Sequence, residues 1–163
     1  MKYTINTHYS HELINEAALA YWKKNFTRPF IVSLLLMILA LGRIFILDIR
    51  DWLSGTFLCF SIIFSLMIIW AYFIYRNRSL AVFEEMEAKA AELIFSEEGL
   101  SVKSDTGSAE VKWKMFKRII KTPNTWVLVY KNNSYSFFPV TGVSYEVLEY
   151  ISEKVVEHGG QLK

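Results

Sequence analysis

Few residues in this chain of 163 have the types and spacing that catalysis or metal binding requires. His8 and His11 lie three positions apart with Glu12 beside them, and on a helix they would share a face. A metal site needs three or four ligands, and the sequence has no further cluster nearby. No serine lies in a nucleophile elbow and no glycine-rich phosphate loop is present. We therefore expect a protein that is not an enzyme and holds no metal and no cofactor.

A basic segment is the second chemical candidate. Lysine and arginine interleave with apolar residues at Lys112, Lys114, Lys117, Arg118 and Lys121. On a strand, Lys112 and Lys114 would share one face and Trp113 the other. Such a face would suit anionic lipid or a partner protein. The plainer interpretation, which we prefer, is a solvated strand face or pairing with an acidic helix; the net charge of +2 is too small to indicate nucleic-acid binding.

Two long apolar runs must position these residues. The first covers residues 29–47, the second covers residues 52–75, and only Asp48-Ile49-Arg50-Asp51 separates them. Each run has about the 20 residues with which a helix crosses a bilayer core of about 30 Å. In lipid the backbone must satisfy its own hydrogen bonds, so both runs are predicted to be helical. The sequence predicts a transmembrane hairpin.

Arg43 is the strong charge inside the first run, about one turn from its outer end. A charge within a span is a functional hypothesis by default. Its long side chain can nevertheless reach headgroups or Asp48 and Asp51. We interpret Arg43 as a membrane-end anchor rather than as part of an ion path.

Small residues recur along both runs at helical spacing. The candidate helix-packing face consists of Ser54, Ser61, Ser65, Ser33 and Ala40. Small residues let two helices approach closely in a membrane. We favour packing of the hairpin on itself, and homodimerisation stays open as the alternative.

Charge next to the runs predicts their orientation. Lys23, Lys24 and Arg28 precede the first run, and Arg76 and Arg78 follow the second. Because basic residues concentrate on the cytoplasmic side, both termini are expected there and the connecting loop outside. A cleaved signal peptide is a poor alternative, since a long polar segment precedes the first run.

The segments that flank the hairpin have their own patterns. Residues 2–7 alternate like a strand, and Ser10 resembles the N-cap of a helix with an apolar stripe. That stripe suits either the headgroup layer or the protein's own cytoplasmic domain.

We expect a helix break around residues 25–28, and Pro29 in the first turn of a new helix. Residues 79–93 predict an acidic helical stalk that stands away from the membrane.

Alternation with a period of two begins at Leu93 and continues between turn signals at residues 97–99, 105–108, 123–124 and 132–134. Trp113 is expected in a strand with its ring in the core. Ser144 is expected to cap a helix that ends near Glu157. Its predicted core stripe is Val147, Leu148, Ile151, Val155 and Val156. The fold class is thus a membrane α+β protein, with an antiparallel β-meander closed by a C-terminal helix.

The stretch Phe95-Ser96-Glu97-Glu98-Gly99-Leu100-Ser101-Val102-Lys103-Ser104, with Val111-Lys112-Trp113 and Phe138-Pro139 after it, resembles the C-terminal domain of the YcxB-like family of bacterial membrane proteins. The resemblance extends over nearly the whole chain. It implies a bacterial inner-membrane protein of unassigned biochemical function with a small PH-like cytoplasmic domain. Family members often place a basic residue after the proline, where this chain has Val140-Thr141-Gly142.

We therefore expect four segments. These are a cytoplasmic strand and amphipathic helix (1–28), a transmembrane hairpin (29–75), a cytoplasmic helical stalk (76–92) and a cytoplasmic YcxB-like β domain with its C-terminal helix (93–163). The leading hypothesis is a hairpin that tethers a PH-like domain at the inner membrane for protein or lipid contacts. The runner-up is an immunity protein whose hairpin binds a membrane-active toxin or pore-former. The expected partners are the lipid bilayer and another membrane protein or a toxin, not nucleic acid.

The charge-based orientation predicts the outcome of a reporter experiment. A reporter active only outside the cytoplasm should be silent when fused after Lys163 and active when inserted at Ile49, because basic residues flank the hairpin on its cytoplasmic side. Enzyme activity of the two fusions in whole cells measures this. The reverse pattern would overturn the orientation.

Overall fold

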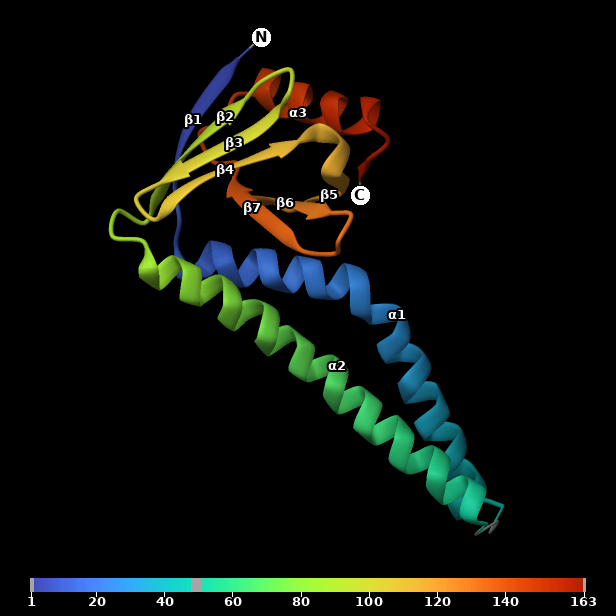
Figure 1. Cartoon of the computed structure of the whole chain (residues 1–163). Helices are drawn as coiled ribbons and strands as arrows, with labels where there is room; N and C mark the ends of the chain where they lie inside the picture. Colours follow the sequence, from blue (N-terminus) through green and yellow to red (C-terminus); the bar gives the residue numbers. More distant parts are fainter. Residues whose placement is uncertain (1, 48–50, 163) are drawn as a thin grey trace. The chain divides into compact units, whose positions relative to one another are not determined.

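The computed structural model of the protein describes residues 2–47 and 51–162 (Figure 1). Its elements in chain order are β1 (Tyr3–His8), α1 (His11–Phe45), α2 (Trp52–Glu85), β2 (Ala90–Phe95), β3 (Gly99–Ser104), β4 (Gly107–Lys112), the 3-10 turn η1 (Trp113–Met115), β5 (Phe116–Lys121), β6 (Thr125–Tyr130), β7 (Tyr135–Pro139), α3 (Tyr145–Glu157) and β8 (Gln161–Leu162). Two long apolar helices, antiparallel strands and a helix near the C-terminus confirm the predicted α+β class. Asp48 and Ile49, which entered the predictions above, lie outside the described residues.

The chain forms two compact units. Trp22–Tyr75 is the hairpin unit; Met1–Tyr21 together with Arg76–Lys163 is the sheet unit. Both helices therefore begin or end inside the sheet unit and continue through the hairpin unit.

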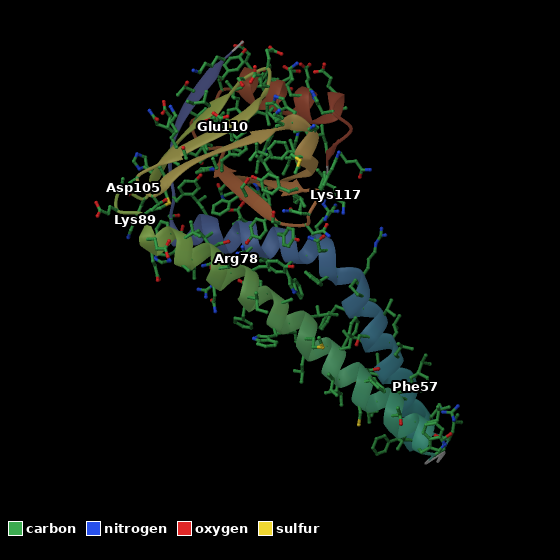
Figure 2. The ribbon with its side chains drawn as sticks, in the orientation of Figure 1. Phe57, Arg78, Lys89, Asp105, Glu110 and Lys117 are labelled. Carbon is green, nitrogen blue, oxygen red and sulfur yellow. The ribbon has the colours of Figure 1, made fainter. Side chains whose placement is uncertain are left out.

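The hairpin unit exposes its apolar side chains. Both α1 and α2 contain a long apolar stretch, and less than a fifth of each stretch is buried. Leu39 is 66% exposed and Phe60 is 68% exposed. Phe57 likewise projects from the surface of α2 (Figure 2). A helix in the core of a soluble protein would bury such residues, so this pattern fits two helices that are long and apolar enough to cross a membrane.

The predicted helix break at residues 25–28 is wrong. The helix α1 is continuous from His11 to Phe45 with Pro29 inside it. Proline removes one backbone donor and with it one helical hydrogen bond, but residues 25–28 include no glycine that would end the helix in a left-handed conformation. The Thr27 hydroxyl donates to the Lys23 carbonyl at 2.6 Å, as hydroxyls in continuous helices often do.

Pairing of β1 with β2 joins the segment of the sheet unit before the hairpin to the segment after it. The strands are antiparallel, in register from Tyr3 opposite Phe95 to His8 opposite Ala90. The predicted strand at the N-terminus therefore exists, and it covers an edge of the sheet that β2, β3 and β4 continue. The entire hairpin is inserted between two neighbouring strands.

The helix predicted over residues 79–93 ends earlier than expected. The last helical residue of α2 is Glu85, and Ala90 already belongs to β2. Lys89 between them has φ of 47°, in the left-handed region, and the Asp105 carboxylate accepts a hydrogen bond from the Ala88 amide at 2.9 Å. Pairing of Ala90 and Ala91 with β1 explains why residues with high helix propensity adopt a strand here.

The expected single meander is divided into two sheets. The first has the order β1-β2-β3-β4 and the second the order β7-β6-β5-β8. Between them the chain turns through η1, so Trp113 lies in a 3-10 turn and not in a strand as predicted. Since alternation stops at Lys112, Met115 does not share the buried side of Trp113 and is 43% exposed.

Gly99 permits close approach of neighbouring strands. The sequence prediction assigned this glycine to the turn between β2 and β3, and the Ser96 amide indeed donates to the Gly99 carbonyl at 2.9 Å. A Cβ at this position would clash with the backbone carbonyl oxygen of Val111 on β4. The absence of a side chain thus matters for strand packing as much as for the turn.

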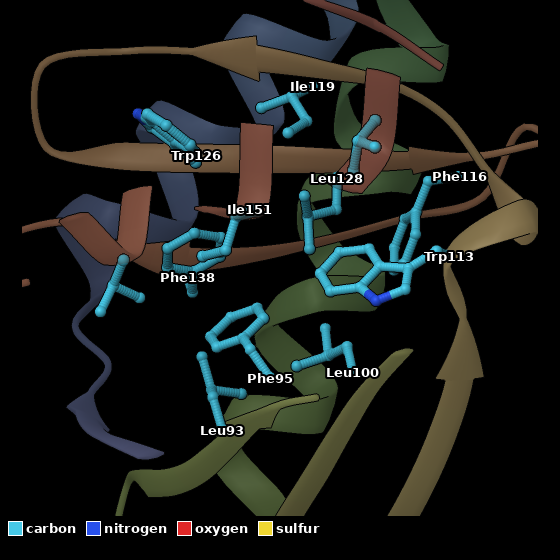
Figure 3. Packing of buried hydrophobic residues seen from close by; sticks show 12 residues of the cluster. Leu93, Phe95, Leu100, Trp113, Phe116, Ile119, Trp126, Leu128, Phe138 and Ile151 are labelled. Carbon is cyan, nitrogen blue, oxygen red and sulfur yellow. The ribbon is translucent and has the colours of Figure 1, made fainter. Parts of the chain in front are cut away.

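The core of the sheet unit is aromatic (Figure 3). Trp113 is 1% exposed, and its indole nitrogen donates to the Ser96 carbonyl at 2.8 Å. Its ring stacks on Phe95 with centroids 6.3 Å apart. Phe116 and Phe138 complete the aromatic cluster, and Ile151 of α3 packs against it. The prediction that the ring of Trp113 is buried is confirmed.

The second sheet is buried on both faces. Residues Trp126 to Val129 on β6 are all buried, although neighbours on a strand point to opposite sides. The start of α1 supplies the second cover: Ile14, Ala17, Ala18 and Tyr21 are at most 2% exposed. Tyr21 stacks on Tyr135 of β7 at 4.5 Å. Of the two alternatives for this stripe, packing on the protein's own domain is therefore correct.

We expect Trp113→Ala to lower the free energy of unfolding of the sheet unit by about 3–5 kcal/mol, because it leaves a cavity and an unpaired Ser96 carbonyl. Lys112→Ala, at an exposed position one residue earlier, should change it by less than about 0.5 kcal/mol. Pulse proteolysis of the full chain in detergent across a urea series measures both. Equal stability of the two variants would contradict the position of this ring in the core.

Candidate functional site

The predicted packing face lies between the two helices of the hairpin unit. Ser33, Ser54, Ser61 and Ala40 are at most 5% exposed and Ser65 is 9% exposed. The Ser33 hydroxyl donates to the Ser61 carbonyl at 2.9 Å and is also 2.9 Å from the Ser65 hydroxyl. The hydroxyls of Ser33 and Ser65 thus find partners without water, as an apolar surrounding requires. The arrangement connects α1 to α2 within one chain.

A second polar contact connects the same helices nearer the sheet unit. The indole nitrogen of Trp22 donates to the Ile68 carbonyl at 2.8 Å, and Ile68 is 4% exposed. The partner of Trp22 is 46 positions away, so no local pattern indicated the contact.

Arg43 is held by polar groups at the turn of the hairpin. Its Nε donates to the Ser54 hydroxyl at 3.0 Å, and its Nη2 lies 2.9 Å from a carboxylate oxygen of Asp51. The other Asp51 oxygen accepts a hydrogen bond from the Ser54 amide at 2.8 Å, as an N-cap residue of α2 does. This contact between Arg43 and Asp51 is the kind expected of a membrane-end anchor.

The predicted basic residues do not form one face. Lys112, Lys114 and Lys117 are exposed around η1, whereas Lys121 lies at the far end of β5 with its ammonium 4.5 Å from the centre of the Trp126 ring. Arg118 is only partly exposed. A register shift between Phe116 and Arg118 interrupts the alternation on which a single basic face depends.

A different basic group forms around η1. The Lys131 amide donates to the Met115 carbonyl at 2.9 Å, which brings a lysine of the β6–β7 connection next to Lys114. Lys117 donates to the Asn133 side chain at 3.0 Å in the same connection. Met115 is exposed among these lysines. Sequence reasoning missed Lys131 because it reaches this position through tertiary pairing.

The histidines considered for metal binding have other neighbours. His11 lies edge-on against Phe83 with ring centroids 4.9 Å apart, and His8 is exposed at the end of β1. Within residues 2–47 and 51–162, no three His, Cys, Asp or Glu side chains are placed to hold a metal ion together.

A charged network joins α3 to the turn before β3. The Lys154 ammonium lies 2.9 Å from Glu97 and 2.9 Å from Glu157. The hydrogen bond from Lys154 lowers the pKa of Glu97 to about 2. Both carboxylates in turn raise the pKa of Lys154 above its ordinary value. The two carboxylates are exposed and Lys154 is partly buried, so we interpret the three groups as a surface contact rather than as a reactive centre.

Comparison with known proteins finds a match for the C-terminal part of the chain. Residues 95–152 match the family model described as YcxB-like protein. The match extends from the end of β2 into α3 and so includes the Trp113 core, which confirms the resemblance for the C-terminal domain. A comparison with curated proteins finds no match.

The hydroxyl contacts of the hairpin predict a measurable stability. Ser33→Ala should destabilise pairing of α1 with α2 by about 0.6–1.7 kcal/mol, because it removes both contacts of this side chain. Leu39→Ala, at a position 66% exposed, is the matched control and should have a smaller effect. Titration with sodium dodecyl sulfate, followed by circular dichroism, measures both. A Ser33 variant as stable as the wild type would show that these hydroxyls contribute nothing.

Proposed function

We propose that this chain is a non-enzymatic bacterial inner-membrane protein whose hairpin tethers a small PH-like domain at the cytoplasmic surface for protein or lipid contacts. The observation that carries the proposal is the exposed apolar surface of α1 and α2, joined covalently at both ends to one folded unit. Two sheets followed by a helix suit a PH-like domain.

Pairing of β1 with β2 supports the proposed topology independently of charge. These strands lie on either side of the hairpin in sequence and are neighbours in one sheet. Two segments of one sheet belong on one side of a membrane, which agrees with both termini in the cytoplasm. The choice of side rests on the basic residues beside the runs.

A lipid contact is supported by the group around η1. Lys112, Lys114 and Lys117 are exposed, and Met115 among them is an apolar side chain that could enter the headgroup layer. Each lysine near an anionic surface gains about 1 kcal/mol. Lys121 is excluded from this version of the proposal because it lies over Trp126.

Immunity against a membrane-active toxin is the second candidate. A shallow depression lies on the outer surface of α2, with Gly55 and Thr56 beside the larger Phe60 and Ile63. A helix of another membrane protein would find a complementary surface there. An adjacent toxin gene would favour this candidate over the first.

Hydrogen exchange of the full chain in lipid nanodiscs tests the leading proposal. Peptides from residues 29–47 and 52–75 should be protected in neutral and in anionic nanodiscs, because lipid excludes water from both helices. Peptides from residues 112–117 should gain protection only with anionic lipid, and increasing salt should remove that gain.

A double variant tests the lipid contact separately from the insertion of the hairpin in the membrane. Lys112→Glu with Lys114→Glu should abolish the lipid-dependent gain, whereas Lys103→Glu on β3 should leave it unchanged. Free exchange of the hairpin peptides would contradict the tether itself. Unchanged protection at residues 112–117 would contradict the lipid version and leave protein contact.

A further inference from the structure

A groove of about 600 Å³ lies along α3 in the sheet unit, beside strands β5, β6 and β8. Its apolar side chains come from three elements: Trp126 of β6, Leu148 and Val156 of α3, and Leu162 of β8. Val156 is 51% exposed and Leu162 is 42% exposed. The sequence prediction placed five residues of α3 in the core: Val147, Ile151 and Val155 are buried, and Leu148 is partly buried and packs against the core. The prediction for Val156 is wrong, since it faces the groove.

The face of α3 along the groove is acidic. Glu149, Glu153 and Glu157 follow one another at intervals of four residues, so they share one side of the helix. Glu157 is paired with Lys154. Among the described residues, no ion pair involves Glu149 or Glu153, and Lys121 across the groove lies over the Trp126 ring. The groove therefore offers apolar contacts beside two unneutralised carboxylates.

The edge of β5 that β8 occupies lies along the same groove. Within the described residues, the strand β8 pairs with it in parallel through Arg118 opposite Gln161 and Ile119 opposite Leu162. In the part of the chain that the structure describes, Ile120 and Lys121 continue the edge past these two pairs, and their ladder partners lie on β6. The edge of β5 thus accepts a parallel strand, and up to residue 162, where the description ends, that strand is two residues long.

We propose that this groove binds an extended cationic segment of a partner polypeptide, which adds to the edge of β5 in parallel and displaces β8. Main-chain hydrogen bonds to the strand edge would supply affinity, and pockets for alternate side chains would supply specificity. On the side of the added strand that faces α3, apolar side chains would contact Trp126 and Leu148, and basic ones would lie beside Glu149 and Glu153. The inference names the partner class of the tethered domain and therefore rests on the proposed function.

Titration of a labelled peptide tests the groove. The probe is an eight-residue peptide that repeats lysine-lysine-valine-valine, so that each face of the added strand carries both kinds of side chain. The full chain is held in nanodiscs of neutral lipid so that the bilayer does not attract the probe. Fluorescence anisotropy should show saturable binding that weakens as salt rises. A probe with glutamate in place of lysine should not bind.

Three variants locate the binding site. Glu149→Gln with Glu153→Gln should weaken binding about tenfold, since it removes two charges that face the probe. The matched control Glu110→Gln, at an exposed position of β4 (Figure 2), should bind like the wild type. Gln161→Pro should bind several-fold more tightly, because proline disfavours pairing of β8 and so weakens the internal competitor.

Hydrogen exchange gives an independent measurement on the same samples. The probe should protect the amides of residues 118–121, which an adventitious charge contact would not do. Unchanged affinity in the double glutamine variant, or unchanged exchange in β5, would overturn the proposal. Insertion into nanodiscs reports on the tether and the titration reports on the groove, so the two failures are distinguishable.

Discussion

The antiparallel pairing of β1 with β2 is the interaction on which the rest of the structure depends. It joins residues 3–8 to residues 90–95 and thereby closes the chain around the hairpin. The start of α1 then lies on the second sheet, where Ile14, Ala17 and Ala18 bury its apolar stripe. A fragment that begins at Glu92 would lack both β1 and this helical cover. The hairpin is accordingly an insertion in the sheet unit, and the C-terminal region alone is an incomplete domain.

The hairpin follows a different physical rule from the sheet unit. Burial of apolar surface drives packing in water, and the cluster around Trp113 and Phe95 shows its result. Between helices in lipid this driving force is absent, so close approach and hydrogen bonds must hold them together. The contacts of Ser33 with Ser61 and Ser65 satisfy that requirement, while large side chains such as Phe60 remain on the outside.

The two surfaces proposed for interactions differ in charge and in origin. Exposed lysines and an exposed methionine lie close together in sequence around η1, whereas the groove along α3 combines apolar side chains with Glu149 and Glu153. The sequence groups Lys121 with the lysines around η1. The structure instead places its ammonium over the Trp126 ring, beside the groove. A domain with one basic and one acidic surface can contact a membrane and a cationic partner at different places.

The sequence by itself determined the features that depend on local pattern. Length and hydropathy predicted both apolar helices, alternation and turn residues predicted most strands, and the spacing of the serines predicted the face that packs between the helices. Only the tertiary structure decided the features that depend on distant partners. These include the division into two sheets at η1, the continuity of α1 through Pro29, the end of α2 at Glu85 and the groove beside β8. The physical reason is that the residue at which a strand or helix ends depends on the free energy of all its contacts, including those with residues distant in sequence. The partners of Ala90, Met115 and Leu162 lie at least 16 positions away in sequence, at His8, Lys131 and Ile119.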